Sequence, residues 1–175
     1  MYDNLDFYLP IDKVKSCDFL REIPNKLERT SEHFFNDGND IAVSGSLGLL
    51  KVSVTKNKIK IKDSSFCKWL LGDNIQGLYR GDVQRGFEQL SDLLGLPMDK
   101  ANVTRIDLAK NLLLKYEQST YLNHLGNLQY YSRMPQNNGL YYQNSNGTLV
   151  FYNKIHEAKL KGVPIPEMYK NKHLL

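Results

Sequence analysis

The feature that most constrains the fold is a run of alternating side chains at residues 49–63, LLKVSVTKNKIKIKD. Apolar and polar residues alternate on both sides of the dipeptide Lys56-Asn57, a pattern typical of two strands joined by a tight turn. Successive side chains of a strand point to opposite faces, so one face of the predicted hairpin is apolar and packs on a core. The apolar positions are Leu50, Val52, Val54, Ile59 and Ile61.

The opposite face of this hairpin carries four lysines, Lys51, Lys58, Lys60 and Lys62. Such a surface suits nucleic acid, because lysines release counterions from phosphates and a hairpin can enter a groove or lie along a backbone. Edge strands also carry lysine simply to prevent aggregation. Both interpretations stay open, and we take the four lysines as candidate DNA-binding residues.

The remaining elements are predicted from their periodicity and from turn and cap residues. Towards the N-terminus we predict a strand over 2–9 ended by Pro10, a short or broken helix within 16–30, a strand at 41–43 and a turn at 45–48. Further along we predict a helix over 82–94 with Asp82 as N-cap, a strand beginning at 101, a hairpin over 139–154 and a short helix over 155–161. The sum is an α+β fold with a mainly antiparallel sheet and helices on one face, in a single domain over 1–175.

Charge and cysteine usage narrow the setting. The net charge is +4, and residues 101–175 hold nine Lys/Arg against four Asp/Glu, so the basic excess belongs to the second half. That excess permits nucleic-acid binding without demonstrating it. Cys17 and Cys67 lie far apart and form no CxxC, which indicates a reducing compartment. No apolar run approaches the roughly 18 residues of a membrane span, so we expect a cytoplasmic protein of a bacterial host cell without membrane contact.

The segment Val103-Thr104-Arg105-Ile106-Asp107 is the first candidate for chemistry. Val103, Arg105 and Asp107 are expected on one face of a central strand, where a carboxylate must pair or bind a cation. Oxygen ligands suit Mg²⁺ or Mn²⁺, so Asp107 is a candidate metal ligand, and Arg105 is a candidate phosphate contact. The alternative is a structural Arg–Asp pair that braces the sheet.

The second candidate is Phe151-Tyr152-Asn153-Lys154, followed by Glu157. Tyr152 and Lys154 are expected on one strand face, where a tyrosine hydroxyl beside a cation can attack a phosphodiester and the lysine can neutralise developing charge. The alternative is a tyrosine packed at the sheet edge next to a solvated lysine.

The tract 130–139, YYSRMPQNNG, is polar and predicted as a loop, in which Arg133 is a candidate DNA contact. Tyrosine pairs at Tyr130-Tyr131 and Tyr141-Tyr142 are either stacking platforms for unpaired bases or sheet packing. The histidines are isolated in the sequence, and neither a P-loop nor a Gly-x-Ser-x-Gly elbow occurs.

Two longer stretches, VTRIDLAKN and GLYYQNSNGTLVFYNKIHE, carry a resemblance, together with YDNLDFYLP and RGDVQRGFEQLSDLLGLP. In this order they resemble the phage replication-initiation proteins of the filamentous-phage gene II/X type and related plasmid rolling-circle initiators. The resemblance spans most of the chain. It implies an HUH-nickase-like fold and an origin-specific nickase, in which a tyrosine attacks one DNA strand and a divalent metal polarises the scissile phosphate. The product is a 5′-phosphotyrosine link.

Carried onto this sequence, the resemblance implies that Asp107 lies at the metal site with Arg105 beside it. Tyr152, Lys154 and Glu157 belong to the second shared segment, and Glu157 joins Asp107 as a candidate ligand of Mg²⁺ or Mn²⁺. Relatives place an Arg-x-Glu strand and the nucleophilic tyrosine further downstream, so the resemblance also allows a chain truncated at the C-terminus.

Three functions remain open from the sequence. The first is a metal-dependent nickase acting on single-stranded or hairpin origin DNA, with a homodimer as one option. The second is a non-catalytic module that recognises the origin through the lysine hairpin and Arg133. The third is a phage protein that binds a host protein through its aromatic surface.

Overall fold

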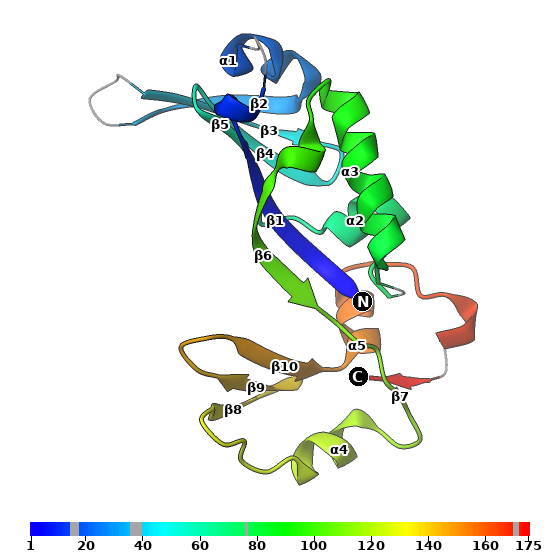
Figure 1. Ribbon diagram of the computed structural model, residues 1–175. Helices are drawn as coiled ribbons and strands as arrows, with labels where there is room; N and C mark the ends of the chain where they lie inside the picture. The colour runs from blue at the N-terminus through cyan, green and yellow to red at the C-terminus, as the bar shows by residue number, and fades with distance from the viewer. Residues whose placement is uncertain (15–17, 36–39, 76, 170–171) are drawn as a thin grey trace. The chain divides into compact units, whose positions relative to one another are not determined.

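The computed structural model describes residues 1–14, 18–35, 40–75, 77–169 and 172–175. The chain forms two compact units, Met1–Ala109 and Lys110–Leu175 (Figure 1). The predicted α+β class with a mainly antiparallel sheet is confirmed, whereas the single domain over 1–175 stays a prediction. No helix in these described ranges is long and apolar enough to cross a membrane.

The first unit is built on a six-stranded antiparallel sheet in the order β2-β3-β4-β5-β1-β6. Its strands are β1 (Tyr2–Pro10), β2 (Glu28–Phe35), β3 (Asp40–Leu47), β4 (Leu50–Thr55), β5 (Lys58–Ile61) and β6 (Asn102–Leu108). Its helices are α1 (Phe19–Glu22), α2 (Phe66–Leu71) and α3 (Arg80–Leu94), with 3₁₀ turns at Ile11–Lys13, Pro24–Lys26 and Met98–Lys100. The opening strand and the broken helix around Pro24 are therefore confirmed.

The central hairpin β4–β5 forms as its alternation predicts. Val52 pairs with Ile61 and Val54 with Ile59, and all four side chains are at most 2% exposed. The Thr55 hydroxyl oxygen accepts hydrogen bonds from the backbone N–H groups of Asn57 and Lys58, at 3.4 and 3.2 Å, which stabilises the turn.

The predicted turn at residues 45–48 is displaced. Gly45 lies inside β3 opposite Val52, and the chain reverses at Gly48, whose φ is +58°. Gly45 is required for close approach, because a Cβ there would lie 2.9 Å from Leu27 Cβ. Sequence reasoning mistook a packing glycine for a turn glycine.

All three helices of the first unit contribute to one core on one face of the sheet, as predicted. Phe7 of β1 contacts the rings of Phe66 in α2 and Phe87 in α3, at centroid distances of 5.8 and 4.8 Å. Figure 1 shows α2 and α3 on the same side of the sheet. Phe19 of α1 is buried in the same cluster.

The helix α3 begins earlier than predicted. Tyr79 is its N-cap, and Asp82 occupies the third helical position, where its carboxylate accepts the Tyr79 backbone N–H at 2.8 Å. That hydrogen bond, with the one from Arg85, lowers the pKa of Asp82. The assignment of Asp82 as N-cap is therefore wrong, although the apolar stripe that ends at Leu94 is confirmed.

The second unit is smaller. It contains a three-stranded antiparallel sheet in the order β10-β9-β8, and β7 pairs with β11. The elements are β7 (Leu113–Leu114), α4 (Gln118–His124), β8 (Ser132–Gln136), β9 (Gly139–Gln143), β10 (Thr148–Tyr152), α5 (Lys154–Leu160), a 3₁₀ turn at Glu167–Tyr169 and β11 (His173–Leu174). The predicted hairpin β9–β10 is confirmed, and its Asn144 side chain accepts the N–H groups of Asn146 and Gly147 in the turn.

Candidate functional site

The helices of the first unit pack on one face of its six-stranded sheet, and we call the opposite face the helix-free face. It carries the predicted lysines. Lys60 of β5 lies between Ser53 of β4 and Tyr8 of β1 in the sheet register. The same row continues to Ser44 and Ser31 on one side and to Asn102 on the other. This row crosses all six strands with hydroxyl, ammonium, phenol and carboxamide groups and without a carboxylate.

Lys58 lies beside this row. Its ammonium is 5.8 Å from the centre of the Tyr8 ring, which places a cation over an aromatic face. Lys51 is also exposed on its strand. Lys62 follows β5 and forms an exposed ion pair with Asp63, with a nitrogen–oxygen distance of 3.3 Å. The helix-free face thus brings cations and hydrogen-bond donors next to the Tyr8 ring.

Sequence reasoning missed five members of this face, Tyr8, Ser31, Ser44, Ser53 and Asn102. The signal was present for Ser53, which alternates with the core residues of β4. The others are recognisable only once the strand order is known, because β1 joins the hairpin through long-range pairing with β5 and β6 in turn pairs with β1.

Arg105 and Asp107 form an ion pair on the edge strand β6. Arg105 Nε and Nη2 each donate to one carboxylate oxygen of Asp107, at 2.8 Å in both cases. This bidentate pair, with the charges of Asp6 and Asp63, raises the pKa of Arg105. The pairing proposed as an alternative therefore exists, but β6 is not a central strand, and the Arg105 side chain is 55% exposed.

A β-bulge also changes the predicted faces of β6. Asp6 pairs with Arg105 and Phe7 pairs with Val103, so Thr104 has no opposite residue in β1. The Thr104 hydroxyl donates to the Asp6 carbonyl oxygen at 3.1 Å. The prediction that Val103 shares a face with Arg105 is therefore wrong. The prediction that Arg105 and Asp107 share a face is confirmed.

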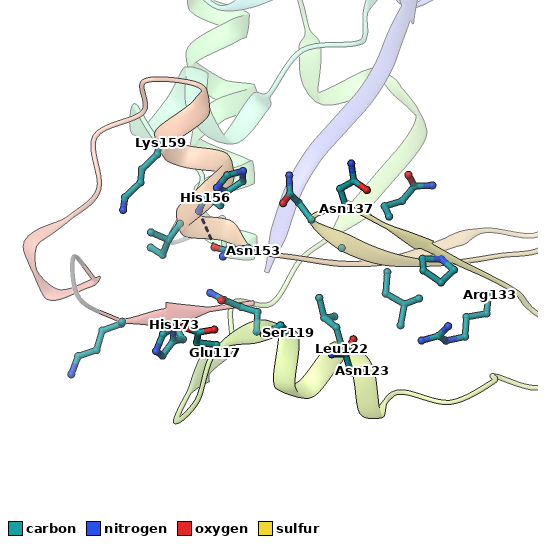
Figure 2. A pocket seen from close by; sticks show the side chains of 18 residues that line it. Glu117, Ser119, Leu122, Asn123, Arg133, Asn137, Asn153, His156, Lys159 and His173 are labelled. Carbon is teal, nitrogen blue, oxygen red and sulfur yellow. Dashed lines mark hydrogen bonds between the residues drawn. The ribbon is translucent and has the colours of Figure 1, made fainter.

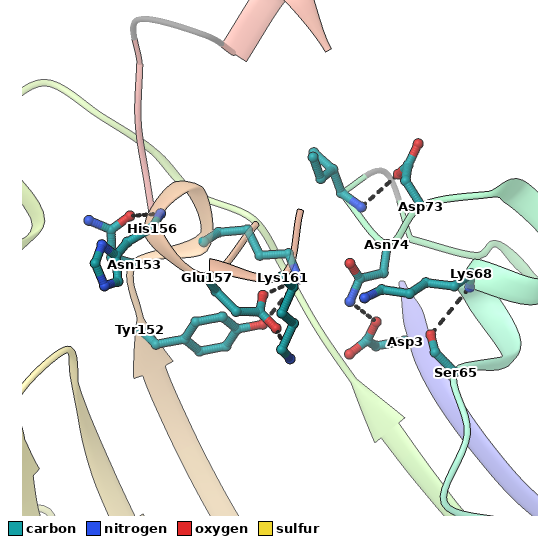
Figure 3. A network of polar contacts seen from close by, with 12 residues as sticks. Asp3, Ser65, Lys68, Asp73, Asn74, Tyr152, Asn153, His156, Glu157 and Lys161 are labelled. Carbon is teal, nitrogen blue, oxygen red and sulfur yellow. Dashed lines mark hydrogen bonds and ion pairs between the residues drawn. The ribbon is translucent and has the colours of Figure 1, made fainter. Parts of the chain in front are cut away.

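The second unit holds a buried lysine, Lys154, that contacts Tyr152 and Glu157. Figure 3 shows Tyr152, Glu157 and Lys161 of this network. Lys154 is 3% exposed, and its ammonium donates to the Tyr152 hydroxyl at 3.2 Å and to Glu157 at 3.0 Å. Burial on its own would lower the pKa of Lys154, but Tyr152 and Glu157 outweigh it and the pKa is raised. The lysine is therefore held as the cation.

Glu157 completes this network. Its second oxygen accepts from Lys161 at 2.5 Å. Burial would raise the pKa of Glu157, yet the hydrogen bonds from Lys161 and Lys154 lower it overall. Lys154 begins helix α5, with Asn153 as N-cap, instead of continuing the strand of Tyr152. The expected strand position and the alternative of a solvated lysine are both wrong, because the helix turns the ammonium back into the unit.

Arg133 lies on strand β8 and not in a loop. Its Nε donates to the Leu125 carbonyl oxygen at 3.0 Å. The polar tract 130–139 was predicted as a loop because it lacks apolar alternation, but β9 pairs with its middle part, Ser132–Gln136. Tyr142 is 4% exposed and donates to the Gly126 carbonyl oxygen, so it packs the unit, whereas Tyr130 is 83% exposed.

The carboxylates predicted as metal ligands are both engaged by cations. Asp107 holds Arg105 with both oxygens, and Glu157 holds two lysines. Within the residues that the structure describes, no group of three or more His, Cys, Asp or Glu side chains could hold a metal ion. In this arrangement the donor set does not fit Mg²⁺ or Mn²⁺. Cys17 lies outside the described residues, and Cys67 is a buried thiol that contacts the Asp73 carbonyl oxygen.

Comparison with known families defines the class as phage replication proteins. The chain belongs to the family described as the N-terminal part of the replication-associated protein of phage gene II, whose model matches residues 1–175. The resemblance to gene II-type phage replication proteins is thereby confirmed. Searches of curated proteins and of solved structures gave no significant match.

Proposed function

We propose that this chain binds origin DNA during initiation of phage replication, in the bacterial cytoplasm, and that the helix-free face of the first unit holds the DNA. The observation that carries the proposal is the row from Ser31 to Asn102, centred on Lys60 and Tyr8. Lysines neutralise phosphates, hydroxyl and amide groups donate to phosphate oxygens, and an aromatic ring stacks on an unpaired base. These properties favour a single-stranded or hairpin substrate.

Fluorescence anisotropy with single-stranded origin DNA of the parent replicon tests this proposal. Lys58→Ala/Lys60→Ala is expected to weaken binding about tenfold. It should also reduce the slope of log K against log salt concentration by about 1.4, because each lost phosphate contact on a single strand accounts for about 0.7. Lys100→Ala removes an exposed lysine outside this face and is the control. Equal effects of the two variants would contradict the proposal.

Strand cleavage is the second proposed activity, and the contact between Lys154 and Tyr152 favours it. The Tyr152 hydroxyl oxygen would attack the scissile phosphorus, forming a tyrosine–phosphate bond as the bond to the 3′-oxygen breaks. The phenol proton passes to water as the new bond forms, and the departing 3′-oxygen takes up a proton from water. A neighbouring ammonium favours the phenolate and offsets charge on the phosphate.

Nicking of supercoiled parent DNA, with and without Mg²⁺ or Mn²⁺, tests the cleavage proposal. Wild-type protein should produce nicked circles with covalently attached protein, and Tyr152→Phe should abolish attachment while retaining DNA binding. Nicked circles that form only in the presence of Mg²⁺ or Mn²⁺ would indicate a requirement for a divalent metal ion. DNA binding without nicking would leave the chain as a recognition module, and indifference to DNA would favour a host-protein partner.

A further inference from the structure

A polar pocket in the second unit has no part in either proposed activity. Its volume is about 740 Å³, within the range of pockets that hold small molecules or cofactors. Figure 2 shows its walls, with Ser119 and Asn123 on α4, Asn137 after β8 and Lys159 on α5. All the residues that line it belong to the one unit.

Positive charge dominates the ionised groups of this pocket. Arg133, Lys159 and Lys172 line it, and Glu117 is its one carboxylate. Among the described residues none of these three cations takes part in an ion pair. The hydrogen bond from Arg133 Nε to the Leu125 carbonyl oxygen orients the guanidinium and leaves its other N–H groups for a ligand. An anionic group such as a phosphate is the complement of this charge.

Carboxamide groups supply a second kind of recognition. Six of them line the pocket: Gln118, Asn123, Gln136, Asn137, Asn138 and Asn153. Gln118 donates to the Leu174 carbonyl oxygen and Asn153 caps α5, so the other four are the ones proposed to contact a ligand. A carboxamide donates and accepts side by side, which matches the paired donors and acceptors on the edge of a nucleobase. Leu122 is half-buried, Pro135 is exposed and both line the pocket, so an apolar surface is available to the flat face of a base.

We propose that this pocket takes one unpaired nucleotide, binding its base through the carboxamides and its phosphate through the cations. The proposal deepens the proposed DNA-binding function and rests on it for the source of the nucleotide, an unpaired position of the origin strand. The same chemistry would accept a free nucleotide, and the test separates these two sources. A pocket of this kind gives base selectivity that a lysine face does not provide, because phosphate contacts carry no sequence information.

The test compares single-stranded oligonucleotides with abasic oligomers of equal length and charge, using the full chain. Wild-type protein should bind the base-containing strands at least about fivefold more tightly, in line with the contribution of a recognised base. Asn123→Ala/Lys159→Ala should bring the ratio of the two affinities, for base-containing over abasic strands, close to one. Both positions are exposed and helical, so alanine preserves the helices. Thr120→Ala/Lys115→Ala, from outside the pocket, is the matched control.

The outcomes separate the pocket from the lysine face. Lys58→Ala/Lys60→Ala should weaken both kinds of strand equally and leave the ratio intact. If wild-type protein binds DNA but the pocket variant keeps the ratio, the pocket proposal is overturned while the DNA-binding function stands.

A titration with the four deoxynucleoside monophosphates tests whether the pocket binds a free nucleotide. If no strand binds, but a monophosphate binds wild-type protein and not the pocket variant, the pocket holds free nucleotide and the DNA-binding proposal fails. If neither strands nor monophosphates bind, both proposals are overturned.

Discussion

The two units differ in the interactions that stabilise each of them internally. The first has a continuous apolar core in which aromatic rings of β1, α2 and α3 meet, and the polar side chains of its central hairpin lie on the opposite sheet face. The second buries few apolar side chains, among them Leu140 and Ile155, and includes the buried ion pair of Lys154. The contrast shows that one unit separates its core from a polar sheet face by strand alternation, whereas the other places polar groups inside.

The largest effect should come from the core of the first unit. Phe7→Ala removes a fully buried ring that contacts two other aromatic rings, and should lower the free energy of unfolding by about 4 kcal/mol. Urea unfolding followed by fluorescence of Trp69, which packs against this core, measures it. Phe34→Ala, at a side chain 64% exposed, is the control and should change stability by no more than about 0.5 kcal/mol. Similar losses in the two variants would contradict the assigned core.

A smaller loss should follow when the buried cation of the second unit is removed. Lys154→Met leaves Glu157 with one cationic partner and should destabilise the unit by about 3 kcal/mol. Thermal unfolding followed by circular dichroism reports the change. Lys161→Met removes a side chain that is 58% exposed, so its cost should stay below about 1 kcal/mol. A Lys154→Met protein as stable as the wild type would show that an apolar group serves equally well there.

Acid should affect the second unit through Glu157. Its folded pKa lies below the ordinary glutamate value of 4.5, so the unfolded state binds a proton first as the pH falls. The contribution of the carboxylate is therefore complete above that ordinary value and is lost as the pH falls through the folded pKa. Urea unfolding of wild type and Glu157→Gln across this window should show a steeper acid dependence in the wild type. Identical slopes would contradict the assigned role of this carboxylate.

The smallest stability effect is expected at the exposed pair on β6. Asp107→Ala should change the free energy of unfolding by less than about 1 kcal/mol, because Arg105 remains solvated when its partner is removed. If Asp107 also serves the proposed cleavage, nicking should disappear while DNA binding persists. Thermal unfolding and the nicking assay on one preparation separate these effects. A large loss of stability would identify the pair as a structural brace.

The difference between the units also explains what could be predicted from the sequence. Strand alternation at 50–61 and the stripe of α3 predict a core, since a period of two or 3.6 residues fixes which side chains share a face. The Asn-Gly turn of β9–β10 was equally local. The bulge at Thr104 and the edge position of β6 depend on pairing with β1, about 100 residues earlier, and no local pattern encodes them.

The second unit was harder to predict because its polar residues do not follow the usual burial preferences. Lysine is almost never fully buried unless paired, so the position of Lys154 could not be inferred from a sequence that does not reveal its partners. Strand β8 carries Pro135 and few apolar residues, so its composition does not predict a strand. It forms because its backbone pairs with β9. The nucleotide pocket draws its carboxamides from segments spread over 118–153, which only the fold brings together.

Acetylation footprinting of lysines, read by mass spectrometry with and without single-stranded DNA, tests the central claim that the helix-free sheet face binds DNA. The proposal predicts that DNA protects Lys51, Lys58 and Lys60, whereas Lys100 stays as reactive as in the free protein. Protection of Lys100 to the same degree, or unchanged reactivity at all four lysines while DNA is bound, would contradict it.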